Sequence, residues 1–201
     1  MAKILIIYGT TQGQTGKVAI RIKEVLVANG HSVDLFDVRK VPSSVVPRNF
    51  DAVLIGASVH VGGYQRDLKK WVKGHSIELK SVTSGFFSVC LSVLQKEASV
   101  QQEIAKIIED FFKASLWQPQ ARAVFAGGLA YSKYSFLVKW WMKRIAEKSG
   151  GDTDTSRDYE YTDWNAVSRF TLDFSNSLIR NGKVILPHPQ SARKFEYENR
   201  T

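Results

Sequence analysis

Short apolar runs alternate along this chain with segments whose apolar residues recur at helical spacing. Five runs have the length of a strand, and they cover residues 4–8, 33–38, 52–57, 85–91 and 121–126. Strands that alternate with helices in this way predict a parallel sheet with helices on both faces. The run at 52–57 is almost continuously apolar, which is typical of a central parallel strand. The chain is therefore predicted to be an α/β protein with a doubly wound, five-stranded parallel sheet.

The predicted helices follow the strands in order. The first begins at Gly16 and ends at Asn29 and Gly30, residue types that commonly terminate a helix. Three more are expected around residues 68–72, at residues 100–114 and from Asp163 to about Asn181.

Residues 127–161 interrupt this regular order as an insertion between the fifth strand and the last helix. The insertion has a helical pattern of its own near residues 135–147, followed by a polar loop at residues 149–155. We therefore expect one domain over residues 1–181 and a C-terminal extension over residues 182–201.

Composition limits the classes of protein that fit. A chain of 201 residues with 44% hydrophobic content is typical of one globular domain. No apolar stretch reaches the roughly 20 residues that a membrane span needs, and the chain enters a strand at once in place of a signal peptide. Cys90 is the only cysteine and the four histidines are scattered, which disfavours disulfides and metal sites. A cytoplasmic protein without a metal is expected.

The turn after the first strand carries the most specific chemical signal. Residues 9–15 read Gly-Thr-Thr-Gln-Gly-Gln-Thr and lead into the first helix. Backbone N–H groups at a helix N-terminus lack partners, and the helix dipole adds about half a positive charge there, so such a turn favours a phosphate group. The side chains of Thr10, Thr11 and Thr15 would add hydroxyl donors. A phosphate monoester site is predicted, with an ordinary strand-to-helix turn as the alternative.

Two familiar nucleotide motifs do not fit this turn. A Walker A loop needs Gly-Lys followed by Ser or Thr, but Gly16 and Lys17 are followed by Val18. A dinucleotide fingerprint needs Gly-x-Gly-x-x-Gly, whereas the glycines here are Gly9, Gly13 and Gly16. Neither motif is therefore present in this turn.

Two further loops are expected to converge on the same place. Residues 58–64 follow the third strand and residues 88–92 end the fourth. Ligands of doubly wound sheets bind beyond the carboxyl ends of the strands, where the strand order reverses. These loops are therefore predicted to complete the site of the phosphate turn.

The phosphate turn resembles the flavin mononucleotide (FMN) phosphate loop of flavodoxins, and the order of elements is similar to theirs along almost the whole chain. One departure is Gln12, where flavodoxins usually carry Ser or Thr. The resemblance implies FMN as cofactor and a sheet of strand order 2-1-3-4-5.

Five short motifs narrow the resemblance. They lie at residues 55–58, 87–89, 126–129, 149–155 and 161–164, and together they resemble the flavodoxin-type protoporphyrinogen IX dehydrogenases of bacteria. That family implies FMN-dependent oxidation of protoporphyrinogen IX in haem biosynthesis, with electrons passed to a respiratory quinone. The cofactor-binding residues that it implies are Thr10, Thr11, Gln12, Gly13, Gln14, Thr15, Ser58, Val59, His60, Phe87, Ser88, Val89, Cys90, Leu91, Gly151, Asp152, Thr153 and Thr155.

No side chain is predicted to be the catalyst, because a flavin carries the redox chemistry itself and the protein positions it. His60 in the second loop has two interpretations, a proton carrier or a solvent-exposed loop histidine. Cys90 is interpreted as a small buried residue at a strand end, not as a redox thiol.

The charge of the chain favours anionic partners. Its 28 Lys and Arg residues against 19 Asp and Glu residues give a formal charge of +9. In the insertion, aromatic and basic residues alternate in the pattern of an interfacial helix or a lid over a porphyrin, the alternative being a helix packed on the domain. The residues concerned are Lys139, Trp140, Trp141, Lys143 and Arg144. Peripheral contact with the cytoplasmic face of the inner membrane is the expectation.

Two other functions stay open at this point, a flavodoxin-type electron carrier and an NAD(P)H:quinone oxidoreductase. A nucleic-acid binder is disfavoured because the Lys and Arg residues are dispersed along the chain. The sequence does not distinguish a monomer from a homo-oligomer, or one quinone from another.

Overall fold

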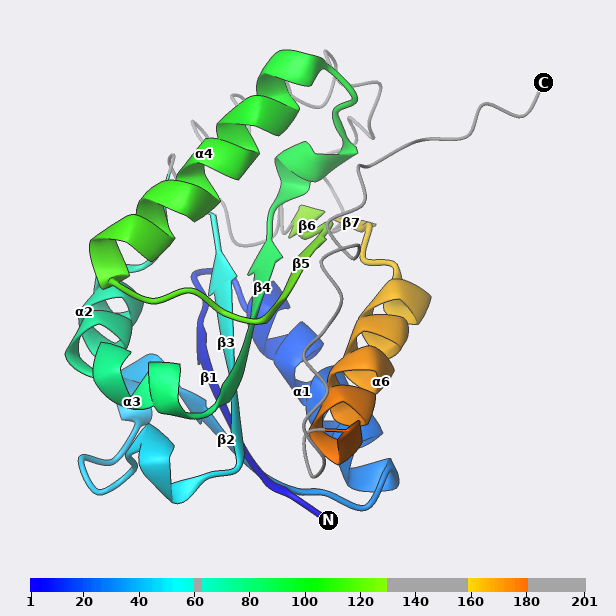
Figure 1. Ribbon diagram of the computed structural model, residues 1–201. Coiled ribbons are helices and arrows are strands. Elements are labelled where there is room, and N and C mark those ends of the chain that lie inside the picture. The colour runs from blue at the N-terminus through cyan, green and yellow to red at the C-terminus, as the bar shows by residue number, and fades with distance from the viewer. Residues whose placement is uncertain (60–62, 130–158, 181–201) are drawn as a thin grey trace.

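A five-stranded parallel sheet forms the centre of the protein. The computed structural model describes residues 1–59, 63–129 and 159–180 (Figure 1). The sheet has the order β2-β1-β3-β4-β5, which confirms the order that the resemblance implied. Its strands are β1 (Lys3–Gly9), β2 (Ser32–Asp37), β3 (Ala52–Ser58), β4 (Thr83–Val89) and β5 (Ala121–Phe125).

The strand order reverses at β1. Ile6 of β1 is in register with Leu35 of β2 on one side and with Leu54 of β3 on the other. The chain leaves β1 first toward β2 and later returns to β3 on the opposite side. Connections that diverge in this way leave space beyond the carboxyl ends of β1 and β3, and this is where doubly wound sheets bind ligands.

Helices cover both faces of the sheet (Figure 1). One face carries α1 (Gln14–Ala28) and α6 (Trp164–Arg180). The other face carries α2 (Arg66–Gly74), α3 (Ser76–Ser81) and α4 (Ala98–Ser115). The sequence prediction contained no counterpart of α3. It also contained no counterpart of three short 3-10 helices in the described residues. The 3-10 helices are η1 (Val38–Lys40), η2 (Pro47–Asn49) and η3 (Leu91–Leu94).

The core has two layers because consecutive strand residues point to opposite faces. Leu5 and Ile7 of β1 pack toward α2 and α4, in a cluster with Phe86 and Phe111. Ile4 and Ile6 pack toward α1 and α6, in a cluster that includes Val18, Phe87 and Phe174. Each fully buried side chain of this size contributes about 1.5–3 kcal/mol to folding, so the sheet is a rigid support for the loops at its carboxyl edge.

Strand ends differ from the sequence prediction where local hydrogen bonds turn the backbone. β2 ends at Asp37 and not at residue 38, because the Asp37 carboxylate accepts the Arg39 N–H at 3.0 Å and starts η1. β4 begins at Thr83 and ends at Val89, so that Leu91 belongs to η3 and not to the strand.

The ends of α1 and α6 follow the residues that predicted them. Gly30, just beyond α1, has a φ of +81°, a left-handed conformation that glycine adopts without strain. The Asp163 carboxylate accepts the N–H groups of Asn165 and Ala166, both at 2.9 Å, and so caps the start of α6.

The two ends of the insertion pair with each other. β6 (Gly128–Leu129) and β7 (Tyr159–Glu160) form a short antiparallel ladder beside the end of β5. Residues 130–158, including the expected helix near residues 135–147, lie outside the described residues. Within the described part of the chain, no helix is long and apolar enough to cross a membrane.

Candidate functional site

A glycine in the left-handed conformation ends the turn between β1 and α1. Gly13 caps α1 with a φ of +103°, and its N–H donates to the Thr10 hydroxyl at 2.9 Å. The Gly13 carbonyl accepts the Lys17 N–H at 3.1 Å, the first bond of the helix. The Thr10 oxygen is thus an acceptor inside the turn, which leaves its proton for a ligand. The positive end of α1 points into the same turn.

Thr15 supplies the clearest sign of a missing partner. Its side chain is fully buried at the start of α1, and its hydroxyl has no hydrogen-bond partner among the described residues. A buried polar group left unsatisfied costs about 1–3 kcal/mol. An anionic acceptor at the turn would satisfy this hydroxyl, so the residues present fit a phosphate monoester.

Gln65 joins two of the three predicted loops. Its Nε2 donates to the Thr11 hydroxyl at 3.2 Å and to the Ser58 hydroxyl at 2.6 Å. Its Oε1 is buried, has no hydrogen-bond partner in the described part of the chain, and would stand 2.9 Å from a Cβ on Gly9. Sequence reasoning missed Gln65, because a lone glutamine before a helix carries no recognisable signal.

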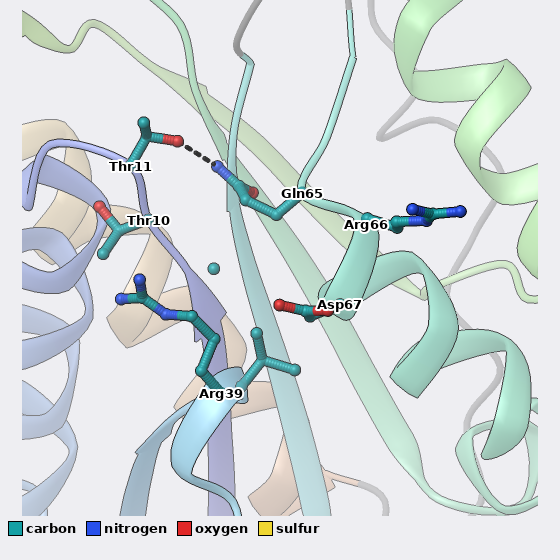
Figure 2. A pocket seen from close by; sticks show the side chains of 8 residues that line it. Thr10, Thr11, Arg39, Gln65, Arg66 and Asp67 are labelled. Atoms are coloured by element: carbon teal, nitrogen blue, oxygen red, sulfur yellow. Dashed lines mark hydrogen bonds between the residues drawn. The ribbon is translucent and has the colours of Figure 1, made fainter.

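A cavity of about 310 Å³ lies beside this bridge (Figure 2). Figure 2 shows Asp67 directed toward the cavity and Arg66 directed away from it. Arg39 donates two hydrogen bonds to the Asp37 carboxylate, from Nε to Oδ1 at 3.0 Å and from Nη2 to Oδ2 at 2.5 Å. This pairing lowers the pKa of Asp37. The lining residues are Gly9, Thr10, Thr11, Val38, Arg39, Gln65, Arg66 and Asp67.

The loop after β3 ends in the core. Tyr64 is buried and makes edge contacts with Phe86 and Phe111. Its hydroxyl donates to the Ser88 hydroxyl at 3.0 Å, and burial raises its pKa. Tyr64 therefore packs against β4 in the core, and its buried ring does not form a wall for a ligand.

The end of β4 is buried on both faces. The side chains of Phe87 and Ser88 are fully buried, and those of Val89 and Cys90 are nearly so. These residues therefore offer backbone groups, not side chains, to a ligand at this edge. Leu91 in η3 is partly exposed. Burial raises the pKa of the Cys90 thiol, consistent with the interpretation of a packing residue.

The side chain of Gln14 bonds a residue that flanks the β6–β7 pair. Its Nε2 donates to the Thr162 hydroxyl at 2.8 Å, and that hydroxyl donates to the Ala126 carbonyl at 2.9 Å. One turn further along α1, Lys17 forms an ion pair with Glu160 at 2.9 Å. The two contacts join the first turn of α1 to β7 and to the residues that flank the strand pair.

The structure thus brings the turn at residues 10–15 together with Ser58 and with the ends of β3 and β4. Val59 continues the β3–β4 pairing, since its N–H donates to the Val89 carbonyl at 3.0 Å. Gln12 is a partly buried residue of the turn. Ten of the predicted cofactor and insertion residues lie outside the described residues: His60, Lys139, Trp140, Trp141, Lys143, Arg144, Gly151, Asp152, Thr153 and Thr155.

Comparison with known proteins agrees with this arrangement. The flavodoxin domain family matches residues 5–156. The protoporphyrinogen IX dehydrogenase (quinone) of Escherichia coli K12 is 33% identical over 174 residues, which are 87% of this chain and 95% of that protein. The protein of the same name from Leishmania major is 35% identical over 176 residues, which are 86% of this chain and 74% of that protein. The resemblance seen in the sequence motifs is confirmed.

Solved structures share the fold at low sequence identity. The flavodoxin of Streptococcus pneumoniae TIGR4 has a TM-score of 0.54 at 10% identity, covering 90% of this chain and 99% of that one. Oxidised flavodoxin 1 of Bacillus cereus has a TM-score of 0.51 at 12% identity, covering 87% and 97%. The sheet order, the phosphate turn and these matches lead to one conclusion. This chain belongs to the flavodoxin domain family, in the group that includes the protoporphyrinogen IX dehydrogenases (quinone).

Proposed function

We propose that this protein oxidises protoporphyrinogen IX to protoporphyrin IX, with FMN as its cofactor and a respiratory quinone as electron acceptor. The observation that carries the proposal is the 33% identity over 95% of the length of the E. coli dehydrogenase. The Thr15 hydroxyl, which has no hydrogen-bond partner among the described residues, supports the cofactor part of the proposal, because a phosphate-bearing cofactor would satisfy that group.

The described residues would hold FMN by its phosphate. Thr15 would donate its hydroxyl proton, and Thr10, whose oxygen already accepts the Gly13 N–H, would donate its own. The positive end of α1 favours the charge of the phosphate. When bound, FMN supplies the redox chemistry, taking a hydride equivalent from the substrate and passing electrons to the quinone.

The sheet edge contributes rigidity beside the phosphate turn. The N–H of Val59 bonds the Val89 carbonyl, and the N–H of Cys90 bonds the Phe125 carbonyl, both at 3.0 Å. These bonds continue the ladder past the strand ends and hold the backbone at Val59 and at Cys90. A backbone held at these two points loses less freedom when a ligand binds beside it, which lowers the cost of binding and orientation.

The turnover test uses purified protein loaded with FMN, mixed anaerobically with protoporphyrinogen IX and a menaquinone analogue. Growth of porphyrin fluorescence that requires both the protein and the quinone is the expected result. Absence of growth with FMN bound would contradict the proposed reaction. Rapid reduction of the flavin by NADH or NADPH with no porphyrin formed would instead identify a nicotinamide-dependent quinone reductase, and inactivity in both assays would favour an electron carrier.

Peripheral contact with the inner membrane is a further part of the proposal. The support is the formal charge of +9 and the alternation of aromatic and basic residues at Lys139, Trp140, Trp141 and Lys143. Each Lys or Arg near an anionic surface contributes about 1 kcal/mol to binding. We expect the protein to sediment with anionic vesicles and not with neutral ones. The double variant Trp140→Ala and Trp141→Ala should lose this sedimentation while it retains FMN.

A further inference from the structure

We propose that Gln65 is a positioning residue that makes the Thr11 hydroxyl a donor to the phosphate of the cofactor, and so adds to the preference for FMN over riboflavin. The inference rests on the proposed function, since it concerns the cofactor proposed there. It assigns a role to a residue that lies 54 positions from its partner in the sequence.

Gln65 donates hydrogen bonds from its amide nitrogen to two hydroxyl groups. An amide nitrogen has two protons and accepts nothing, so the Gln65 Nε2 occupies an acceptor position on both hydroxyl oxygens that it contacts. These contacts are 3.2 Å to Thr11 and 2.6 Å to Ser58. Neither hydroxyl can give its own proton back to Gln65. Both protons are therefore available to an acceptor on a ligand.

Gly9 leaves the space that the Gln65 amide occupies. Oε1 of Gln65 is buried against Gly9, where a Cβ would stand 2.9 Å from it. Gly9 does not have a positive φ, so its backbone alone does not require glycine. Glycine is required at this position because the Gln65 amide occupies the space that a Cβ would need. The end of β1 and the residue before α2 are thus fitted to each other at this point.

Thr11 is one of the residues that line the cavity. Thr11 is exposed in the same turn as Thr10, on the rim of the cavity of about 310 Å³ (Figure 2). A phosphate held by the turn and by the N-terminus of α1 would be a strong, negatively charged acceptor for the Thr11 proton. Hydrogen bonds to charged acceptors are stronger than those to neutral ones. The contribution of Gln65 should therefore appear with FMN and be absent with riboflavin, which lacks the phosphate.

The test measures binding of FMN and of riboflavin to the apoprotein by flavin fluorescence quenching. Gln65→Met keeps the length of the side chain and removes the amide. We expect it to weaken FMN binding about tenfold and to change riboflavin binding less than twofold. Gln118→Met is the matched control, because Gln118 is exposed, bonds Arg122 near the start of β5 and is remote from the turn. It should leave the affinity for both flavins unchanged.

A double-mutant cycle separates positioning from general support. In a Thr11→Val protein, Gln65→Met should have no further effect on FMN binding, because the hydroxyl that it orients is gone. Equal weakening of FMN and riboflavin binding by Gln65→Met would overturn the inference. So would a double variant whose loss of FMN affinity equals the product of the two single fold-losses. Gly9→Ala is a second variant, which displaces the amide without removing it and should also weaken FMN selectively.

Circular dichroism and the wild-type titration keep the outcomes distinct. If Gln65→Met does not fold, Gly9→Ala and Gln65→Ala carry the same comparison. If the wild-type apoprotein binds no FMN, the proposed function fails. If it binds FMN and all three variants bind it equally well, only the role of Gln65 is refuted.

Discussion

The ring of Phe87 lies across the backbone of Gly56, so closely that a Cβ on Gly56 would stand 2.1 Å from Phe87 Cζ. The two residues are register partners on β3 and β4. Phe87 is fully buried and packs in the cluster that joins the sheet to α1 and α6. A glycine at position 56 thus allows a large ring to fill the core just below the loops of the site.

Gly56→Ala should therefore destabilise the protein. The contact is with a packed ring, so the ring or the strand has to move, and overpacking of this kind costs about 1–3 kcal/mol. Urea unfolding followed by circular dichroism measures the change. Adding Phe87→Leu should make the loss smaller than the sum of the two single losses. A Gly56→Ala protein with an unchanged urea midpoint would show that the strands yield freely.

Thr15→Val should have opposite effects on the apoprotein and on the FMN complex. Valine has the same shape but removes a buried hydroxyl that has no partner among the described residues, so the free energy of unfolding of the apoprotein should stay equal or rise. FMN binding should weaken about tenfold or more, while Thr15→Ser should retain it. Parallel urea unfolding and flavin titration test both. A Thr15→Val protein with full FMN affinity would contradict a phosphate contact at this residue.

His31 should make stability depend on pH. Its Nδ1 accepts the Ala2 N–H at 3.2 Å and its Nε2 lies 2.8 Å from the Ser175 hydroxyl, so the neutral ring with a proton on Nε2 fits the fold. Burial lowers the pKa of His31 below its ordinary value of about 6.5. The unfolded chain then takes up the proton first as the pH falls. The stabilisation is complete above the unfolded pKa and is lost as the pH falls toward the folded one.

The measurement compares the free energy of unfolding of the wild type and of His31→Gln between pH 7.5 and pH 5. The wild type should lose more stability over this range, because the carboxylates and the other histidines are common to both proteins. Parallel pH profiles would show that His31 titrates alike in the folded and unfolded states.

Cys90 should react slowly with thiol reagents while the protein is folded. Its side chain is buried and burial raises the pKa of the thiol, so little thiolate exists near pH 8. A disulfide reagent that releases a chromophore should modify one thiol per chain in urea and far less in buffer, because Cys90 is the only cysteine. Cys90→Ala should still bind FMN. Fast stoichiometric modification of the folded protein would identify an accessible reactive thiol instead.

Local patterns predicted the parts of the site that are close in sequence. The turn at residues 9–15 was identifiable because its glycine, its hydroxyl residues and the following helix are contiguous. The end of α1 at Gly30 and the start of α6 at Asp163 were identifiable for the same reason. Each depends on backbone geometry within a few residues, which local sequence largely specifies.

Side-chain directions at the other two loops were not accessible in the same way. Phe86 and Phe87 are both buried, because a central parallel strand is covered on each face and its sequence shows no alternation. Tyr64 ends the loop at residues 58–64, and it packs on Phe86 and Phe111. Only the neighbouring elements decide which of these rings face the core.

By itself, the amino-acid sequence determined the alternation of strands and helices and the phosphate-type turn, since periodicity and turn chemistry are local properties. Tertiary structure alone decided that Gln65 meets Thr11 and Gly9. That meeting depends on the crossover that carries the chain from β1 through β2 to β3 and back beside its own start. No property of residue 65 or of its neighbours encodes the contact, because the contact arises from the packing of segments that are far apart in the chain.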